Sequence, residues 1–288
     1  MNFEDIRLLT ITALFADDEL FEQLVLKGGN ALSIIHRLSS RTSLDLDFSM
    51  QGDFADIENT KKRIFRTLKT RFDSVGLTVF DEVLEPKPDL RGKEDTKPWW
   101  GGYELTFKLI RNEEYARSSE QMDKMRIRSL VTGPNEMRNF KVDFSKNEYT
   151  EGKIQKEIDH YTIYVYTPEM IVIEKLRAIC QQLPEYTHKG RSKARARDFY
   201  DIHRVVSAVK IDLTSADNTE LLRNIFAAKQ VPLTLLGNVH STLEFHRPDW
   251  DAVRSSVEES LEEFDFYFKY LIDQIASLKA LWEEKPPS

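Results

Sequence analysis

The sequence predicts an α/β (α+β) fold in which strands and helices alternate at first and a helical part follows. Two observations lead to this prediction. Before about residue 166, short apolar or alternating segments typical of strands lie between helical patterns. From residue 168 onward, apolar residues recur at the three- and four-residue steps of helices. We therefore expect two domains, residues 1–166 and 167–288, with Thr167-Pro168 as the first helix start of the second.

The composition is that of a globular protein. Of the 288 residues, 41% are hydrophobic and 31% are charged, which is enough apolar material for a sizeable core. The formal net charge of −7 argues against a generally basic nucleic-acid-binding surface but leaves room for a local basic site. The single cysteine, Cys180, excludes an internal disulfide framework and fits a reducing cytoplasm. No signal-peptide pattern and no apolar run near the roughly 20 residues that span a bilayer are present, so we expect a cytoplasmic protein without membrane contact.

The expected elements follow from the spacing of the apolar residues. Helices are predicted over residues 3–16 and 53–75 and after Gly28-Gly29, with a short one at most in the charged segment 113–130. The predicted strands are residues 24–26, 44–48, 77–84, 103–110, 140–145 and 161–166, with an exposed loop over 85–98. In the second domain, helices are predicted over residues 168–182, 197–209, 218–229 and 253–282.

A pair of carboxylates points to a metal site. Asp45 and Asp47 alternate with apolar residues, which indicates a strand, and residues i and i+2 of a strand share a face. Two like charges held side by side repel, and a divalent cation with oxygen ligands would relieve that repulsion. Asp143, in the later strand 140–145, could supply a third carboxylate. The alternative is that the two aspartates face solvent on an edge strand.

A glycine pair precedes these aspartates. Gly28 and Gly29 lie at an expected helix start, where freed backbone amides can form a binding site for phosphate. The alternative is an ordinary tight turn.

The second domain holds cationic and acidic candidates. Lys175 lies about two turns into the helix that starts at residue 168 and could reach a triphosphate, or could simply be solvated. Asp198 and Asp201, at i and i+3, share a helix face and could orient Lys175 or an arginine, or act as a base. A purely structural pairing of Arg197 with Asp201 fits the spacing equally well. A basic patch could hold the phosphates of a nucleotide or of RNA, or could be a charged loop; it comprises Lys189, Arg191, Lys193, Arg195 and Arg197.

Taken together, these motifs resemble the nucleotidyltransferase superfamily and, more narrowly, the AbiEii/AbiGii toxin family of bacterial nucleotidyltransferases. The resemblance spans about residues 24–205. It rests on five blocks in a fixed order, namely residues 27–32, 41–49, 141–143, 174–178 and 197–202.

The resemblance implies a small mixed sheet flanked by helices, a helical C-terminal domain after it, and an active-site cleft between the two. It also implies a nucleoside triphosphate (NTP) as substrate with Mg²⁺ or Mn²⁺, transfer to the 3′ end of tRNA in some members, and the toxin role in a toxin–antitoxin pair used in phage defence. A cognate antitoxin would then be a partner.

The resemblance also implies roles for particular residues. Asp45 and Asp47 would hold the metal and Asp143 would complete the carboxylate set. Gly28, Gly29 and Ser43 would line the phosphate site, Lys175 would contact the triphosphate together with Arg197, and Asp198 would be the late catalytic aspartate. An RNA acceptor would follow the basic side chains Lys189, Arg191, Lys193 and Arg195.

Three hypotheses remain open from the sequence. The first is a metal-dependent nucleotidyltransferase toxin that acts on a macromolecule, most plausibly tRNA, by attack of a hydroxyl on the α-phosphate. The second keeps this chemistry but uses a small molecule, such as an aminoglycoside, or a protein hydroxyl as the acceptor. The third is a nucleotide-binding regulatory protein without turnover.

Overall fold

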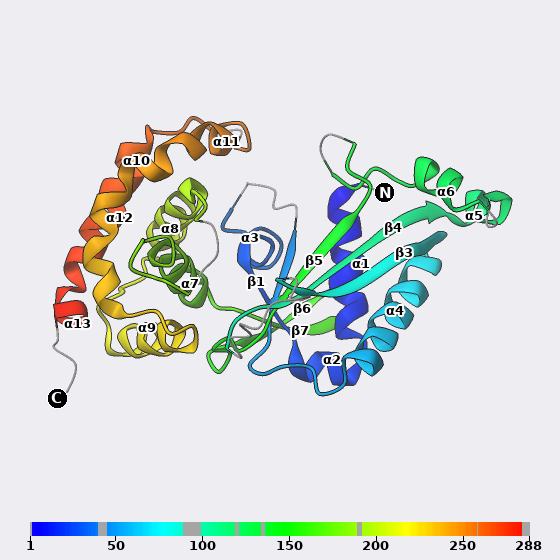
Figure 1. Cartoon of the computed structure of the whole chain (residues 1–288), viewed down its shortest axis with the longest axis horizontal. Helices are drawn as coiled ribbons and strands as arrows, with labels where there is room; N and C mark the ends of the chain where they lie inside the picture. The colour runs from blue at the N-terminus through cyan, green and yellow to red at the C-terminus, as the bar shows by residue number, and fades with distance from the viewer. Residues whose placement is uncertain are drawn as a thin grey trace. The chain divides into compact units, whose positions relative to one another are not determined.

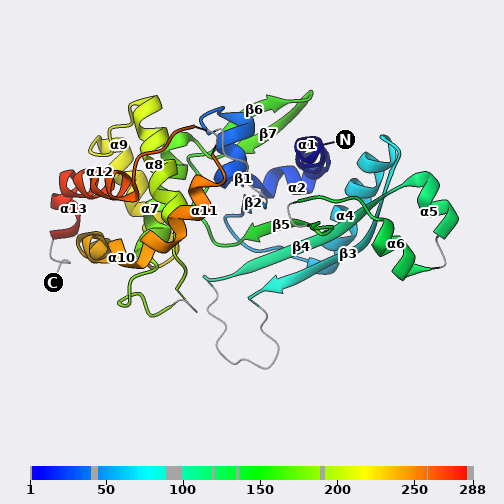
Figure 2. The same cartoon turned by 90° about the horizontal axis from the view of Figure 1, so that it is seen from above.

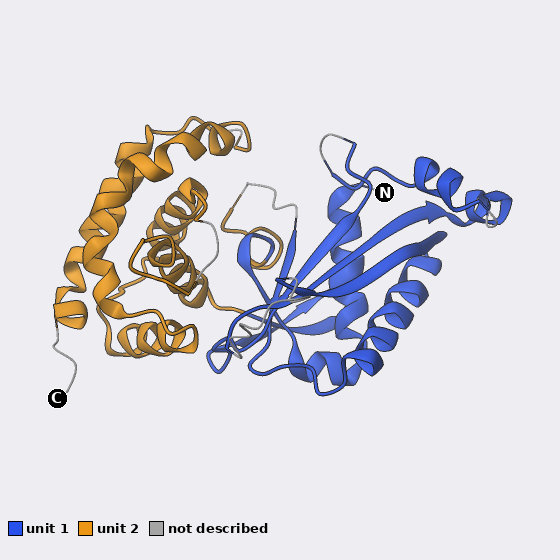
Figure 3. Ribbon diagram, in the orientation of Figure 1, with its two compact units in different colours: residues 1–30, 43–165 blue, residues 31–42, 166–288 orange. Residues whose placement is uncertain are grey.

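The computed structural model describes residues 2–39, 45–88, 99–118, 121–133, 136–188, 192–257 and 259–283. The chain divides into two compact units, shown in Figure 3. The first, here called the sheet unit, comprises residues 1–30 and 43–165, and the second, the helical unit, comprises residues 31–42 and 166–288. The short segment 31–42 is thus grouped with the later part of the chain.

Within the described residues, the sheet unit contains one seven-stranded mixed sheet in the order β3-β4-β5-β2-β1-β7-β6 (Figure 1). The pairs β2–β5 and β1–β7 are parallel, and the other neighbours are antiparallel. Figure 2 shows the long antiparallel ribbon of β3 and β4. The strands are β1 (Val25–Lys27), β2 (Leu46–Ser49), β3 (Leu77–Lys87), β4 (Gly102–Arg111), β5 (Phe140–Ser145), β6 (Ile154–Ile158) and β7 (Tyr161–Val165).

Six of these strands confirm predicted ones, because each alternates or is continuously apolar and supplies buried side chains to one core. Strand β6 was not predicted. Its three middle residues are polar and exposed, as is common on a sheet edge, so its sequence has no apolar pattern. The predicted loop over 85–98 begins later than expected, since β3 continues to Lys87, and residues 89–98 lie outside the described part.

Helices cover the sheet and are positioned by their caps. Helix α1 (Phe3–Phe15) starts with a capping box between Asn2 and Asp5, and α4 (Ile57–Asp73) is capped by Asp56. The two helices pack on each other and on the sheet. Shorter helices are α2 (Asp18–Gln23), α5 (Asn112–Ser118) and α6 (Met122–Arg128). After β1 the chain forms one turn, α3 (Gly28–Asn30), and a π-helical turn over Ala31–Ile35, which is shorter than the helix predicted there.

The helical unit is built on α7 (Pro168–Cys180) and α8 (Ala196–Val209), which pack on each other. Thr167 caps α7 with Pro168 at its first turn, as predicted. The later elements are α9 (Ala216–Ala228), the 3₁₀ segments η2 (Leu233–Thr242) and η3 (Arg247–Asp249), α10 (Leu243–His246), α11 (Trp250–Arg254), α12 (Phe264–Ser277) and α13 (Lys279–Glu283).

The single helix predicted over residues 253–282 is wrong. Helix α11 ends at Arg254, and α12 begins only at Phe264. The intervening segment is rich in serine and glutamate, so it offers no continuous apolar face and its acidic side chains repel one another. The buried face resumes at Phe264, where the regular three- and four-residue steps begin.

Candidate active site

Three neighbouring strands of the sheet unit present a row of carboxylates. Asp47 of β2 is paired in register with Asp143 of β5, and Asp143 is paired with Glu104 of β4. Paired residues on adjacent strands share a face. Asp45 directly precedes β2. The sheet register therefore brings Asp47 and Asp143 together from sequence positions almost a hundred residues apart.

Glu104 belongs to this row and was missed from the sequence. A single glutamate in an alternating strand matches no motif, and only the register with Asp143 reveals it. Knowledge of which strands pair would have identified it.

The glycine turn lies against one of these carboxylates. Gly28 has a φ of +70°, and a Cβ built on it would lie 2.8 Å from Oδ2 of Asp47. The left-handed backbone favours glycine, and a Cβ there would displace the Asp47 carboxylate. Asn30, fully buried, fixes the turn from the other side: its Nδ2 donates to the Asp45 carbonyl at 2.6 Å, and its Oδ1 accepts from Arg7 at 2.7 Å. The glycine pair and the Asp-Leu-Asp segment therefore form one local structure.

Two lysines partly balance the acidic row. Lys87 Nζ donates to both Asp143 oxygens, at 2.8 and 3.0 Å, and Lys141 Nζ lies 2.9 Å from Glu104. Burial raises the pKa of Asp45, and the nearby Asp143 charge adds to that rise while Lys141 opposes it. Burial would also raise the pKa of Glu104, but its lysine partners outweigh burial and lower it.

The donors present suit a divalent cation. Carboxylate oxygens are hard ligands of the kind that Mg²⁺ and Mn²⁺ prefer. Among the residues that the structure describes, no three His, Cys, Asp or Glu side chains form a complete metal-binding group. The set Asp45, Asp47 and Asp143 thus stays a prediction, and a cation at Asp143 would compete with the Lys87 ammonium.

This competition predicts that Lys87→Ala tightens metal binding if Asp143 is a ligand. Loss of the ammonium removes the nearer of the two lysines at Asp143, the other being Lys141 at 3.7 Å, and we expect about a fivefold lower Kd for Mn²⁺, equivalent to ~1 kcal/mol. Calorimetric titration with Mn²⁺ measures it. Lys108→Ala is the matched control, because Lys108 lies on β4, the strand paired with the β3 strand of Lys87, but is itself paired with Asp81. An unchanged Kd in Lys87→Ala would remove Asp143 from the ligand set.

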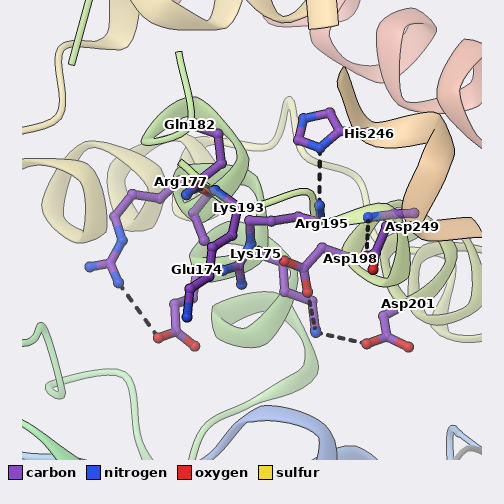
Figure 4. Close-up of polar contacts among 12 residues, drawn as sticks. Glu174, Lys175, Arg177, Gln182, Lys193, Arg195, Asp198, Asp201, His246 and Asp249 are labelled. Carbon is purple, nitrogen blue, oxygen red and sulfur yellow. Dashed lines mark hydrogen bonds and ion pairs between the residues drawn. The ribbon is translucent and has the colours of Figure 1, made fainter. Parts of the chain in front are cut away.

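In the helical unit, Lys175 is held between two aspartates (Figure 4). Its Nζ donates to Asp198 at 2.8 Å and to Asp201 at 2.7 Å, and both carboxylates come from one face of α8, as predicted. The Lys175 side chain is only 10% exposed, so it is not a solvated surface lysine. Lys175 is thus paired with both aspartates, and its catalytic role stays a prediction.

Lys175 and Asp198 are both charged at neutral pH. Burial alone would lower the pKa of Lys175, but the two aspartates raise it above its ordinary value. Burial alone would raise the pKa of Asp198, yet the charges of Arg195 and Lys175 hold it well below its usual range. Asp198 accepts from Arg195 Nε as well as from Lys175, so it bridges two cations.

A second set of side chains fixes the start of α8. The backbone N–H of Arg195 donates to His246 Nδ1 at 3.0 Å, and that of Ala196 donates to Asp249 at 3.2 Å (Figure 4). His246 is fully buried, and burial lowers its pKa to about 4. Because Nδ1 accepts, the neutral ring carries its proton on Nε2. His246 and Asp249 were missed from the sequence, since they lie about fifty residues after the start of α8 and match no motif.

The burial of His246 predicts a loss of stability in mild acid. The unfolded ring titrates near 6.5 and the folded one near 4, so the unfolded state binds more protons between these values and stability falls as the pH falls through that window. The total loss from this group is about 3 kcal/mol. His203, whose pKa burial also lowers, acts in the same direction.

Denaturant unfolding between pH 7 and pH 4 checks this prediction. His246→Asn, whose side-chain oxygen can still accept from Arg195, is expected to show a shallower pH dependence than the wild type. His240→Asn, at an exposed position, should keep the wild-type slope. Equal slopes for His246→Asn and the wild type would show that the ring does not titrate as proposed.

The remaining predicted site residues are exposed or lie outside the described part of the chain. Lys193 and Arg197 are exposed, and the Lys193 N–H donates to the Gln182 side chain at 2.9 Å. Ser43, Lys189 and Arg191 lie outside the described residues.

A mixed sheet that places a glycine turn beside an Asp-Leu-Asp strand, with a helical part after it, defines a nucleotidyltransferase-like fold. The crystal structure of JHP933 from Helicobacter pylori is similar, with a TM-score of 0.51 and 15% identity over 97% of this chain and 91% of that one. So is a second H. pylori protein described as a candidate nucleotidyltransferase, with a TM-score of 0.50 and 16% identity over 99% and 97%. At these identities the likeness concerns the fold.

Residues 11–270 match the family model described as "Nucleotidyl transferase AbiEii toxin, Type IV TA system", and the chain belongs to this family. It is a nucleotidyltransferase toxin of a type IV toxin–antitoxin system, which confirms the family suggested by the five motifs. The family implies an NTP substrate, typically a divalent metal, and an antitoxin context. No curated protein matches the chain. In the described part of the chain, no helix is both long and apolar enough to cross a membrane.

Proposed function

We propose that this toxin transfers a nucleoside monophosphate from an NTP to the 3′ end of tRNA. The observation that carries the proposal is the contact between Gly28 and Asp47, with Asp143 in register beside Asp47. A phosphate-binding turn and a carboxylate row at one place suit a substrate that brings a triphosphate and its cation together.

In this proposal, Asp45, Asp47 and Asp143 hold the Mg²⁺ or Mn²⁺ ion, and the backbone amides after Gly28 bind phosphate oxygens. The ion, when bound, would neutralise charge on the triphosphate and lower the pKa of the attacking hydroxyl. The acceptor oxygen bonds to the α-phosphorus, the bond from that phosphorus to the bridging oxygen breaks, and pyrophosphate leaves. The chain contributes mainly by positioning and by placing charge.

The helical unit is proposed to serve the same reaction. Lys175 and Asp198, which the family resemblance makes catalytic, form a rigid ionised group there. If the group served only to hold α7 and α8 together, well-packed apolar residues would give at least the same stability, because burying charges costs desolvation energy. This cost favours a functional role for the group.

An RNA acceptor is supported by the basic residues near the start of α8. Lys193 and Arg197 are exposed there beside Arg195 and gather positive charge in a chain of net charge −7. If they bind RNA phosphates, neutralising Lys193 and Arg197 together should weaken tRNA binding and reduce its salt dependence.

The acceptor can be identified by incubating the protein with each α-labelled NTP, Mg²⁺ and total cell RNA and protein. We expect label in the tRNA fraction. Label in protein or in small molecules instead would support the second hypothesis, a different acceptor. Thermal stabilisation by a nucleotide without any labelled product would support the third, a binding protein without turnover.

A further inference from the structure

Arg195 is held rigidly at two points while its outer end is open. Its Nε donates to Asp198, and its backbone N–H donates to His246 at 3.0 Å. Its side chain is 34% exposed, and no contact of its two terminal NH₂ groups is found among the described residues. A guanidinium fixed through Nε presents those two NH₂ groups in a defined plane.

Lys175, in contrast to Arg195, is buried and has most of its N–H groups paired. Its side chain is 10% exposed, and two of its three N–H groups are already donated to Asp198 and Asp201. Little of this ammonium can reach a ligand, so its main effect is to fix the two carboxylates.

The four charged side chains Lys175, Asp198, Asp201 and Arg195 differ in their exposure to solvent. Asp198 and Asp201 are 3% and 1% exposed, so the negative charges and the ammonium lie inside, whereas the outer positive charge belongs to Arg195. Asp198 cannot readily take up a proton, because both of its oxygens accept from cations. Asp198 therefore holds the Arg195 guanidinium in place by accepting from its Nε.

We infer that Arg195 is the cation of the helical unit that binds the phosphates of the NTP, through its two terminal NH₂ groups, with Asp198 and Lys175 as positioning residues. The inference rests on the proposed function for the identity of the ligand. A planar fork of two N–H donors matches two oxygens of one phosphate group. This assignment differs from the role that the family resemblance gives to Lys175.

Calorimetric titration with inorganic tripolyphosphate and Mg²⁺ tests the inference. This probe has no base and no transferable nucleotide. We expect Arg195→Gln to weaken binding at least tenfold and Arg195→Lys, which keeps the charge but loses the fork, to weaken it severalfold. The control is Arg204→Gln, because Arg204 lies on α8, whose N-cap is Arg195, and is paired with Glu259; this variant should bind as the wild type does.

A positioning role for Asp198 predicts that Asp198→Asn also weakens tripolyphosphate binding while remaining folded by circular dichroism, which a merely structural role would not do. The inference is overturned if the wild type does not bind tripolyphosphate or if Arg195→Gln binds it as tightly. Should Arg195→Gln fail to fold, wild-type affinity in Arg195→Lys overturns it equally. If binding depends on Arg195 but no labelled NTP yields a product, the proposed function fails and the inference stands.

Discussion

Asp47→Asn is expected to abolish nucleotide transfer while the protein stays folded. Asp47 lies against Gly28 and beside Asp143 in the carboxylate row. The amide keeps the size of the side chain but removes the charge that would hold a divalent cation. Since such an ion stabilises the transition state by several kcal/mol, the rate should fall by about three orders of magnitude or more. Transfer of α-labelled nucleotide, with circular dichroism to check folding, measures the effect.

Asp45→Asn should behave in the same way. Asp53→Asn is a suitable control, because Asp53 is another carboxylate of the sheet unit but accepts from Lys146 and Tyr103. Its transfer rate should stay near that of the wild type. Survival of transfer in both the Asp45 and the Asp47 variants would show that these carboxylates do not hold the metal.

Lys175→Met is expected to cause the largest loss of stability. Removal of the ammonium takes away a cation that contacts two almost fully buried carboxylates, whereas Arg195 still contacts Asp198. Breaking a buried ion network in this way costs about 3–5 kcal/mol. Urea unfolding measures the free energy, and the helical unit should unfold at a markedly lower urea concentration.

A second substitution should restore part of that loss. In Lys175→Met/Asp201→Asn the excess buried charge is gone, and the pair of Asp198 with Arg195 remains. The double variant should therefore be more stable than Lys175→Met alone. If Lys175→Met unfolds at the wild-type midpoint, or if the added Asp201→Asn destabilises further, the ion network does not have the energetic role assigned to it.

The sequence predicted well those features that depend on local pattern. The Gly-Gly turn, the Asp-Leu-Asp strand and the capped start of α7 follow from residue type and period, and each is found at the expected place. The i, i+3 spacing of Asp198 and Asp201 placed both on one helix face, which the contacts of Lys175 confirm.

Features that depend on contacts distant in sequence were not predictable. Glu104 and Lys87 join the carboxylate row through strand register, and His246 reaches the start of α8 through helix packing. Strand β6 was missed because an exposed edge needs no apolar pattern. The division of the predicted helix 253–282 was missed because the regular apolar steps of α12 indicate one long helix, whereas the break depends on the acidic segment before them.

The position of the label in the NTP tests the central claim, transfer of a nucleotide, most directly. The protein is incubated with Mg²⁺ and total cell RNA, once with α-labelled and once with γ-labelled NTP, and the acceptor is separated from pyrophosphate. Attack on the α-phosphate predicts an acceptor labelled only from the α position and γ label released as pyrophosphate, both lost in Asp47→Asn. Label reaching the acceptor from the γ position would instead show phosphoryl transfer and contradict the account.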